Sequence, residues 1–71
     1  MSLIYPDLIH PADAIRMAIE HEKQSQAFYE KAAQMAEDPG ARKMFKELVR
    51  QEIEHQRILE EELDRGIYKD N

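Results

Sequence analysis

Glu52-Ile53-Glu54-His55 lies inside a long amphipathic stretch in the second half of this 71-residue chain. Around it, residues recur in steps of three and four as Phe45, Leu48, Glu52, His55, Leu59 and Leu63. This spacing is typical of the helix face that packs against a core. Glu52 and His55 therefore interrupt an apolar stripe with a carboxylate and an imidazole. Because burial of such groups is costly unless they are paired or bind a metal, the stretch predicts a helix with a polar site on its inner face.

The composition limits the classes of protein to which the chain can belong. A single domain of this size rarely folds stably without disulfides, a metal or oligomerisation. The chain has no Cys, which excludes disulfides and Cys-ligated zinc or iron. Its net charge of -5 and the absence of a basic stripe argue against a nucleic-acid partner. No apolar run approaches the ~18 residues of a membrane span and no signal peptide is evident, so we expect a cytoplasmic protein that uses a metal, oligomerisation or both.

Two helices of similar length are predicted, at about 11–37 and 39–65. Both stretches are rich in helix-forming residues, and Asp38-Pro39-Gly40 separates them. Asp is a good N-cap and Pro a good first helical residue, so the second helix should begin directly after a tight turn. The sequence therefore predicts an all-α protein built on an antiparallel helical hairpin.

The hairpin domain is expected to span residues 11–66, with Gly66 after the end of the second helix. Residues 1–10 form an extended N-terminal lead-in in this interpretation, and residues 67–71 form a short tail. His10, which precedes Pro11, is interpreted as a loop residue.

Glu22 is the matching carboxylate on the first helix, because it interrupts a face of small and apolar residues. It lies sixteen residues before Asp38, while Glu52 and His55 lie fourteen and seventeen residues after it. At ~1.5 Å per residue, these positions are roughly 24 Å and 21–26 Å from the turn. An antiparallel hairpin would therefore hold all three side chains at the same height.

A lone hairpin would leave apolar side chains uncovered, including Phe28, Met35, Met44, Val49 and Ile53. Pairing of two hairpins about a two-fold axis would close a four-helix bundle. That bundle would hold two copies of Glu22 and of the Glu52/His55 pair, which is the ligand set of di-iron carboxylate bundles. Four carboxylates and two imidazoles suit iron, with manganese as the alternative. The sequence thus predicts at least a homodimer whose metal site forms between subunits.

Two motifs, one in each predicted helix, carry a resemblance to a known family. They are Ala18-Ile19-Glu20-His21-Glu22 with Ser25, Phe28-Tyr29 and Ala32-Ala33, and Leu48-Val49 with Glu52 and His55. They resemble the ferritin-like superfamily, and rubrerythrins in particular, over roughly residues 12–63. In that family the first-helix ligand lies seven residues before an aromatic residue, which selects Glu22 and Tyr29. The resemblance implies a ferritin-like four-helix bundle and places Tyr29 with Glu22, Glu52 and His55 among the catalytic residues.

The departures from the family pattern matter for function. Rubrerythrins carry four helices in one chain and usually a Cys-rich domain that supplies electrons, and this chain has neither. Its half-length arrangement is similar to encapsulated ferritins, two-helix proteins whose di-iron site forms between subunits, which suggests a larger ring or cargo inside a protein compartment. The expected activity is oxidation of Fe(II) to Fe(III) by dioxygen or peroxide. A peroxide reductase that uses an external electron donor is one alternative, and a metal-free structural dimerisation module is the other.

Each candidate residue also has a simpler interpretation. Glu22, Glu52 and His55 would form a polar seam that fixes helix register, as buried polar residues do in coiled coils. Tyr29 would be an ordinary amphipathic core residue. His21 lies ~100° around the helix from Glu22 and is interpreted as a solvated surface residue. The run Glu60-Glu61-Glu62 is interpreted as a solvated helix end that is partly balanced by Arg57 and Arg65.

Overall fold

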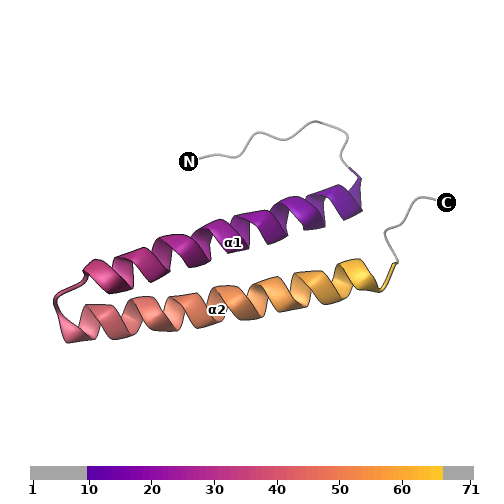
Figure 1. Ribbon diagram of the computed structural model, residues 1–71. Helices are drawn as coiled ribbons and strands as arrows, with labels where there is room; N and C mark the ends of the chain where they lie inside the picture. Colours follow the sequence, from indigo (N-terminus) through magenta and orange to yellow (C-terminus); the bar gives the residue numbers. More distant parts are fainter. Residues whose placement is uncertain (1–9, 67–71) are drawn as a thin grey trace.

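The computed structural model describes residues 10–66 and contains two helices in this part of the chain. Helix α1 spans Pro11–Met35 and helix α2 spans Pro39–Asp64. Figure 1 shows them running antiparallel, side by side, with a short connection at one end. The predicted all-α hairpin is confirmed, and the predicted helix ends at 37 and 65 differ from the observed ends by one or two residues. The predicted tail at 67–71 lies outside the described residues, as does all of the predicted lead-in except His10.

Side chains at the helix starts satisfy amide groups that have no partner inside the helix. Pro11 opens α1, and His10 Nδ1 accepts a hydrogen bond from the Ala12 amide at 3.1 Å. The interpretation of His10 as a plain loop residue was therefore wrong, since it is the N-cap of α1. Asp13 in the first turn adds negative charge where the helix dipole favours it.

The turn between the helices is fixed by two polar contacts. Asp38 Oδ2 accepts a hydrogen bond from the Ala41 amide at 2.8 Å, as expected of an N-cap that stabilises a fold by ~1 kcal/mol. The Arg42 guanidinium donates two hydrogen bonds, at 3.2 and 2.8 Å, to the Ala36 carbonyl, which would otherwise lack a helical partner. These contacts hold the two helix ends together, so the register along the hairpin is set at the turn.

The interface between α1 and α2 buries few side chains. Ala12, Ile19 and Ala33 are the described hydrophobic residues that are buried, each 5–8% exposed. Nearer the turn, the rings of Tyr29 and Phe45 stack across the interface with centroids 6.4 Å apart. Such a core gives a domain of this size little stability on its own.

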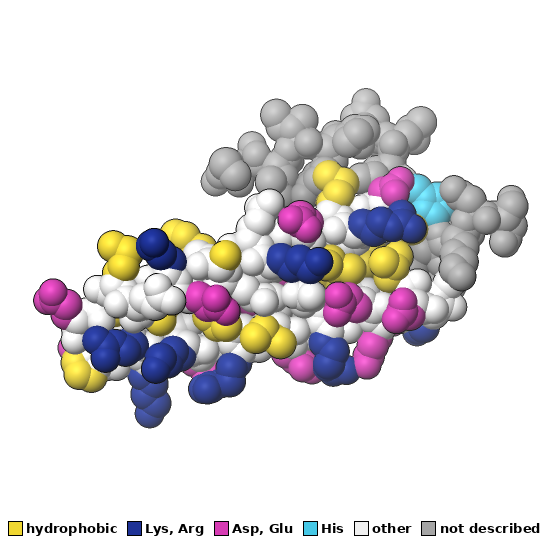
Figure 2. Space-filling model, in the orientation of Figure 1, with side chains coloured by type: hydrophobic (Ala, Val, Ile, Leu, Met, Phe, Trp, Pro, Cys, Tyr) yellow, Lys and Arg dark blue, Asp and Glu magenta, His cyan; other side chains and the backbone are white. Residues whose placement is uncertain are grey.

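Many of the large apolar side chains on the hairpin remain exposed. Figure 2 shows apolar side chains scattered over the exposed face in view. The exposed large hydrophobic residues are Met17, Phe28, Met35, Met44, Ile53 and Ile58. Val49, which was expected among them, is half-buried because it faces α1. The hairpin therefore has apolar surface that a further chain could cover.

Candidate metal centre

Glu22 of α1 meets Glu52 and His55 of α2 halfway along the hairpin. His55 Nδ1 lies 3.5 Å from Glu22 Oε2 and 3.7 Å from Glu52 Oε1. One ligand atom from each of the three residues falls within 4.8 Å of the others. The structure thus brings together the three residues that the count from the turn placed at one height.

The three side chains differ in their exposure. The side chains of Glu22 and Glu52 are each 17% exposed, whereas that of His55 is 55% exposed. The expectation that His55 faces the core of the hairpin was therefore wrong. Gln56 occupies the inner face at this level, where it accepts a hydrogen bond from Gln26 at 2.6 Å. His55 lies at the edge of the α1–α2 interface, with Nδ1 toward the carboxylates.

One oxygen of the carboxylate pair is buried without a hydrogen-bond donor in the described part of the chain. Glu22 Oε2 is shielded from solvent and has no hydrogen-bond partner among the described residues. The side-chain hydrogen bond to Glu22 raises the pKa of Glu52 above its usual value of 4.5, and burial and the charge of Glu22 raise it further. His55 and His21 act in the opposite direction. A cation between the carboxylates would remove this repulsion and supply the missing partner.

The raised pKa of Glu52 predicts how the stability of the metal-free protein depends on pH. Between pH 4.5 and the raised pKa, the folded state binds more protons than the unfolded state, so the free energy of unfolding falls as pH rises. Glu22→Gln removes the neighbouring charge, and we expect its unfolding free energy to fall less across that window. Chemical denaturation at several pH values, with a chelator present, measures both slopes.

Glu20→Gln is the matched control for this prediction, because Glu20 is exposed and lies on the same helix. It should follow the wild-type pH dependence. Identical slopes for wild type and Glu22→Gln would contradict the proposed carboxylate repulsion.

The sequence predicted a functional role for Tyr29 and a solvent-exposed position for His21. Tyr29 lies two turns from Glu22 along α1, half-buried between the rings of Phe28 and Phe45. It makes no hydrogen bond within the described part of the chain, so its observed role is packing.

His21 is exposed as expected, but its charge reaches Glu52 and lowers the pKa of that carboxyl. The sequence interpretation missed this proximity, although its position next to Glu22 could have indicated it.

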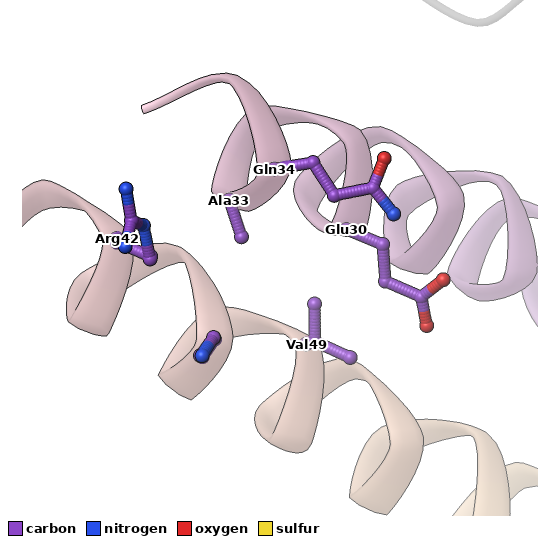
Figure 3. Close-up of a pocket in the computed structure, with 6 residues that line it drawn as sticks. Glu30, Ala33, Gln34, Arg42 and Val49 are labelled. Atoms are coloured by element: carbon purple, nitrogen blue, oxygen red, sulfur yellow. The ribbon is translucent and has the colours of Figure 1, made fainter. Parts of the chain in front are cut away.

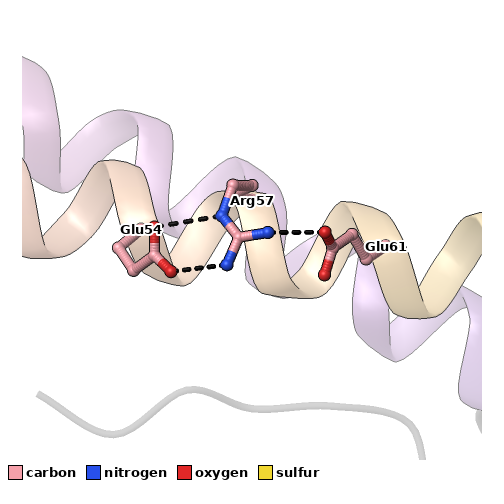
Figure 4. A network of polar contacts seen from close by, with 3 residues as sticks. All are labelled: Glu54, Arg57 and Glu61. Atoms are coloured by element: carbon pink, nitrogen blue, oxygen red, sulfur yellow. Dashed lines mark hydrogen bonds and ion pairs between the residues drawn. The ribbon is translucent and has the colours of Figure 1, made fainter.

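The acidic end of α2 is partly balanced by arginines, as expected. Figure 4 shows Arg57 between Glu54 and Glu61, with both Glu54 oxygens accepting, at 3.0 and 2.6 Å. These carboxylates raise the pKa of Arg57, and Arg57 lowers the pKa of Glu54. Arg65 pairs with Glu62 at 3.2 Å. Glu54 is thus engaged on the outer face of α2 and is separate from the candidate metal centre.

A shallow groove of about 520 Å³ lies nearer the turn, on another side of the hairpin. Its floor is Ala33 and Val49, and its rims carry Glu30 and Gln34 on α1 and Arg42 and Lys46 on α2. Figure 3 shows the side chains from the two helices on either side of the groove. The lining holds a single carboxylate and no imidazole, so the groove has no ligand set of the kind found at Glu22, Glu52 and His55.

Comparison with known families agrees with this geometry. The rubrerythrin family pattern matches residues 3–63, which is most of the chain and includes all three clustered residues. The chain belongs to the rubrerythrin family. Neither the search of curated proteins nor the search of solved structures gave a match. Membership of the rubrerythrin family, within the ferritin-like superfamily, suggests a di-iron carboxylate protein.

The residues present fit an iron site of the rubrerythrin kind. The family typically binds iron, and carboxylates with imidazole are suitable ligands for that metal. The buried Glu22 oxygen, which accepts no hydrogen bond from the described residues, is the observation in this structure that favours a cation there. Within the described residues, no helix is long and apolar enough to cross a membrane.

Proposed function

We propose that this rubrerythrin-family chain binds iron at Glu22, Glu52 and His55 and oxidises Fe(II) to Fe(III). The observation that carries the proposal is the solvent-shielded Glu22 oxygen, which has no hydrogen-bond partner within residues 10–66 and lies 3.5 Å from His55 Nδ1. A polar seam that only fixed helix register would be expected to pair its buried oxygens with donors. A seam that binds a cation leaves its buried oxygens available as ligands for that cation.

A single hairpin supplies only half of the ligand set that a di-iron centre uses. The exposure of His55 indicates where the other half would come from. Helical spacing places a set of residues, most of them apolar or small, on the same side of both helices as His55, and we call this side the His55 flank. On α2 it consists of Met44, Leu48, Gln51, His55, Ile58 and Glu62. On α1 it consists of Ala14, Ala18, His21, Ser25, Phe28 and Ala32. A second copy of the chain covering this flank would complete the site and bury the exposed Phe28, Met44 and Ile58.

The chemistry assigned to the site is electron transfer from iron to an oxidant. Two Fe(II) ions each give up one electron, and dioxygen takes up two electrons and two protons to form hydrogen peroxide. With peroxide as oxidant, two electrons and two protons yield two water molecules. The chain contributes carboxylates that offset the charge of the substrate cations, and His55 fixes the position of one cation through Nδ1. Manganese is the alternative metal, and the cytoplasm or a protein compartment is the proposed location.

Native mass spectrometry after anaerobic addition of Fe(II) tests the proposal. We expect a dimer that carries two iron ions per pair of chains. Exposure of that sample to air should then produce the ultraviolet absorption of Fe(III). A dimer that takes up no iron would contradict the proposal and favour a structural dimerisation module.

A further inference from the structure

Four cationic side chains gather on α2 beside the turn, and we call them the cationic cluster. With Pro39 they line a hollow of about 330 Å³ at the start of the helix, and they are Arg42, Lys43, Lys46 and Arg50. Residues 39–50 carry these four cations against a single carboxylate, Glu47, although the whole chain has a net charge of -5. Figure 2 shows Lys and Arg side chains along α2 near the turn. The hollow adjoins the groove described above, because Arg42 and Lys46 line both.

The cationic cluster is electrostatically costly without an anion. Lys46 is about one turn from both Arg42 and Arg50, so neighbouring charges are ~6 Å apart along the axis, within the Debye length of ~8 Å. Like charges at this spacing repel one another, and the helix dipole disfavours cations at a helix start. Glu47 pairs with Arg50, but Lys43 and Lys46 form no ion pair within residues 10–66. An anionic partner would offset this repulsion.

Arg42 is held in place by the turn. Its Nε and Nη2 atoms donate to the Ala36 carbonyl at 3.2 and 2.8 Å, while Nη1 makes no hydrogen bond within the described part of the chain. A side chain that is already fixed in this way loses little conformational entropy when it binds a carboxylate. Arg42 therefore presents a prepositioned donor at the end of the groove nearer the turn.

The two rims of the groove differ in charge. The α2 rim belongs to the cationic cluster, whereas the α1 rim has Glu30 and Gln34. Figure 3 shows the small apolar side chains of Ala33 and Val49 between the two helices. A ligand in the groove would therefore place anionic groups toward α2 and uncharged polar groups toward α1, and the small floor would let a peptide backbone approach closely.

From this asymmetry we infer that the groove binds an extended acidic peptide segment of a partner protein. In an extended segment, side chains on one side repeat every two residues, or about 6.6 Å. This repeat is close to the ~6 Å that separates Arg42 from Lys46 along α2. Alternate carboxylates can thus contact successive cations of the cluster, while the intervening uncharged side chains face Glu30 and Gln34.

A nucleic acid or a polyphosphate matches the groove less well. Its charges are not confined to one side, so the Glu30 carboxylate would repel the phosphates nearer α1. The peptide site is also separate from the contact with a second copy of the chain, because no residue that lines the groove belongs to the His55 flank. A partner peptide and a second copy can therefore bind at the same time.

Fluorescence anisotropy tests the inference with a labelled synthetic peptide in which glutamate alternates with threonine. The wild-type protein should bind this peptide, and Lys46→Glu should bind it at least about tenfold more weakly, because like charges would then face one another. Lys46 is exposed and repels its neighbours, so the substitution should leave the helical circular dichroism unchanged. Lys31→Glu is the matched control, because it makes the same change in net charge at an exposed residue that lines neither hollow. It should bind the peptide as the wild type does.

Equal affinity of the wild type and Lys46→Glu would overturn the inference, as would the absence of binding at millimolar peptide. A second peptide of the same composition, with its glutamates consecutive, should bind more weakly, since consecutive side chains point to opposite sides of an extended chain. Equal binding of the two peptides would overturn the extended arrangement. Single-stranded DNA that displaces the peptide at an equal concentration of charge would identify a phosphate-binding surface and overturn the choice of partner.

Discussion

The Glu52→Ala variant is expected to lose iron binding and Fe(II) oxidation while remaining helical. Glu52 is 17% exposed, lies 3.7 Å from His55 Nδ1 and clusters with Glu22 and His55, so its removal takes one of three converging ligands. Loss of a residue that only supports a metal ligand costs roughly 10–100-fold in affinity. Loss of the ligand itself should therefore cost more than ~100-fold. Its removal also ends the repulsion with Glu22, so the metal-free hairpin should not be less helical.

Iron titration followed by native mass spectrometry, with circular dichroism on the same samples, measures both parts of this result. Glu54→Ala is the matched control, because it removes a carboxylate two residues away that pairs with Arg57 on the outer face. Glu54→Ala should bind iron as the wild type does. Normal iron oxidation by Glu52→Ala would refute the assignment of the site.

Substitution of Ile58 by Lys is expected to weaken the dimer and, with it, iron binding. Ile58 is 47% exposed in the single hairpin and lies on the His55 flank, one turn beyond His55. A lysine there would place a charge at the centre of the proposed interface. Hot-spot positions near the centre of an interface cost ~2 kcal/mol or more, and ~1.4 kcal/mol corresponds to a tenfold change, so we expect association to weaken by about tenfold or more.

Ile53→Lys is a closely matched control. Ile53 is on the same helix and is 50% exposed, but helical spacing places it away from the His55 flank. Sedimentation velocity over a range of concentrations should show dissociation of Ile58→Lys and an unchanged dimer for Ile53→Lys. Equal weakening by both substitutions would indicate that a different side of the hairpin forms the interface.

The sequence predicted the hairpin because its signals are local. Asp38 and Pro39 are strong markers of a helix start, and Gly66 has the positive φ of 75° expected just after a helix end. Because the turn is tight, the positions of Glu22 and Glu52 along the hairpin axis could be compared by counting residues from the turn. The family resemblance, drawn from the same residues, was confirmed over residues 3–63.

The rotation of side chains around the helix was less predictable. Steps of three and four from Glu52 reach both His55 and Gln56, and periodicity alone does not say which of them faces α1. The structure selects Gln56 because Gln26 bonds to it across the interface. The His10 cap was missed because histidine is not among the usual N-cap residues. The functional role predicted for Tyr29 remains a prediction, since its observed contacts are with aromatic rings.

The small number of buried residues in the hairpin has a consequence for the lifetime of the chain. A chain that lacks both a second copy and metal would open often, because little buried surface opposes unfolding. Proteases remove proteins from such open states, so unpaired chains would be cleared faster than assembled ones. The amount of protein in a cell would then rise with the supply of metal even at a constant rate of synthesis, because assembly itself would protect the chain.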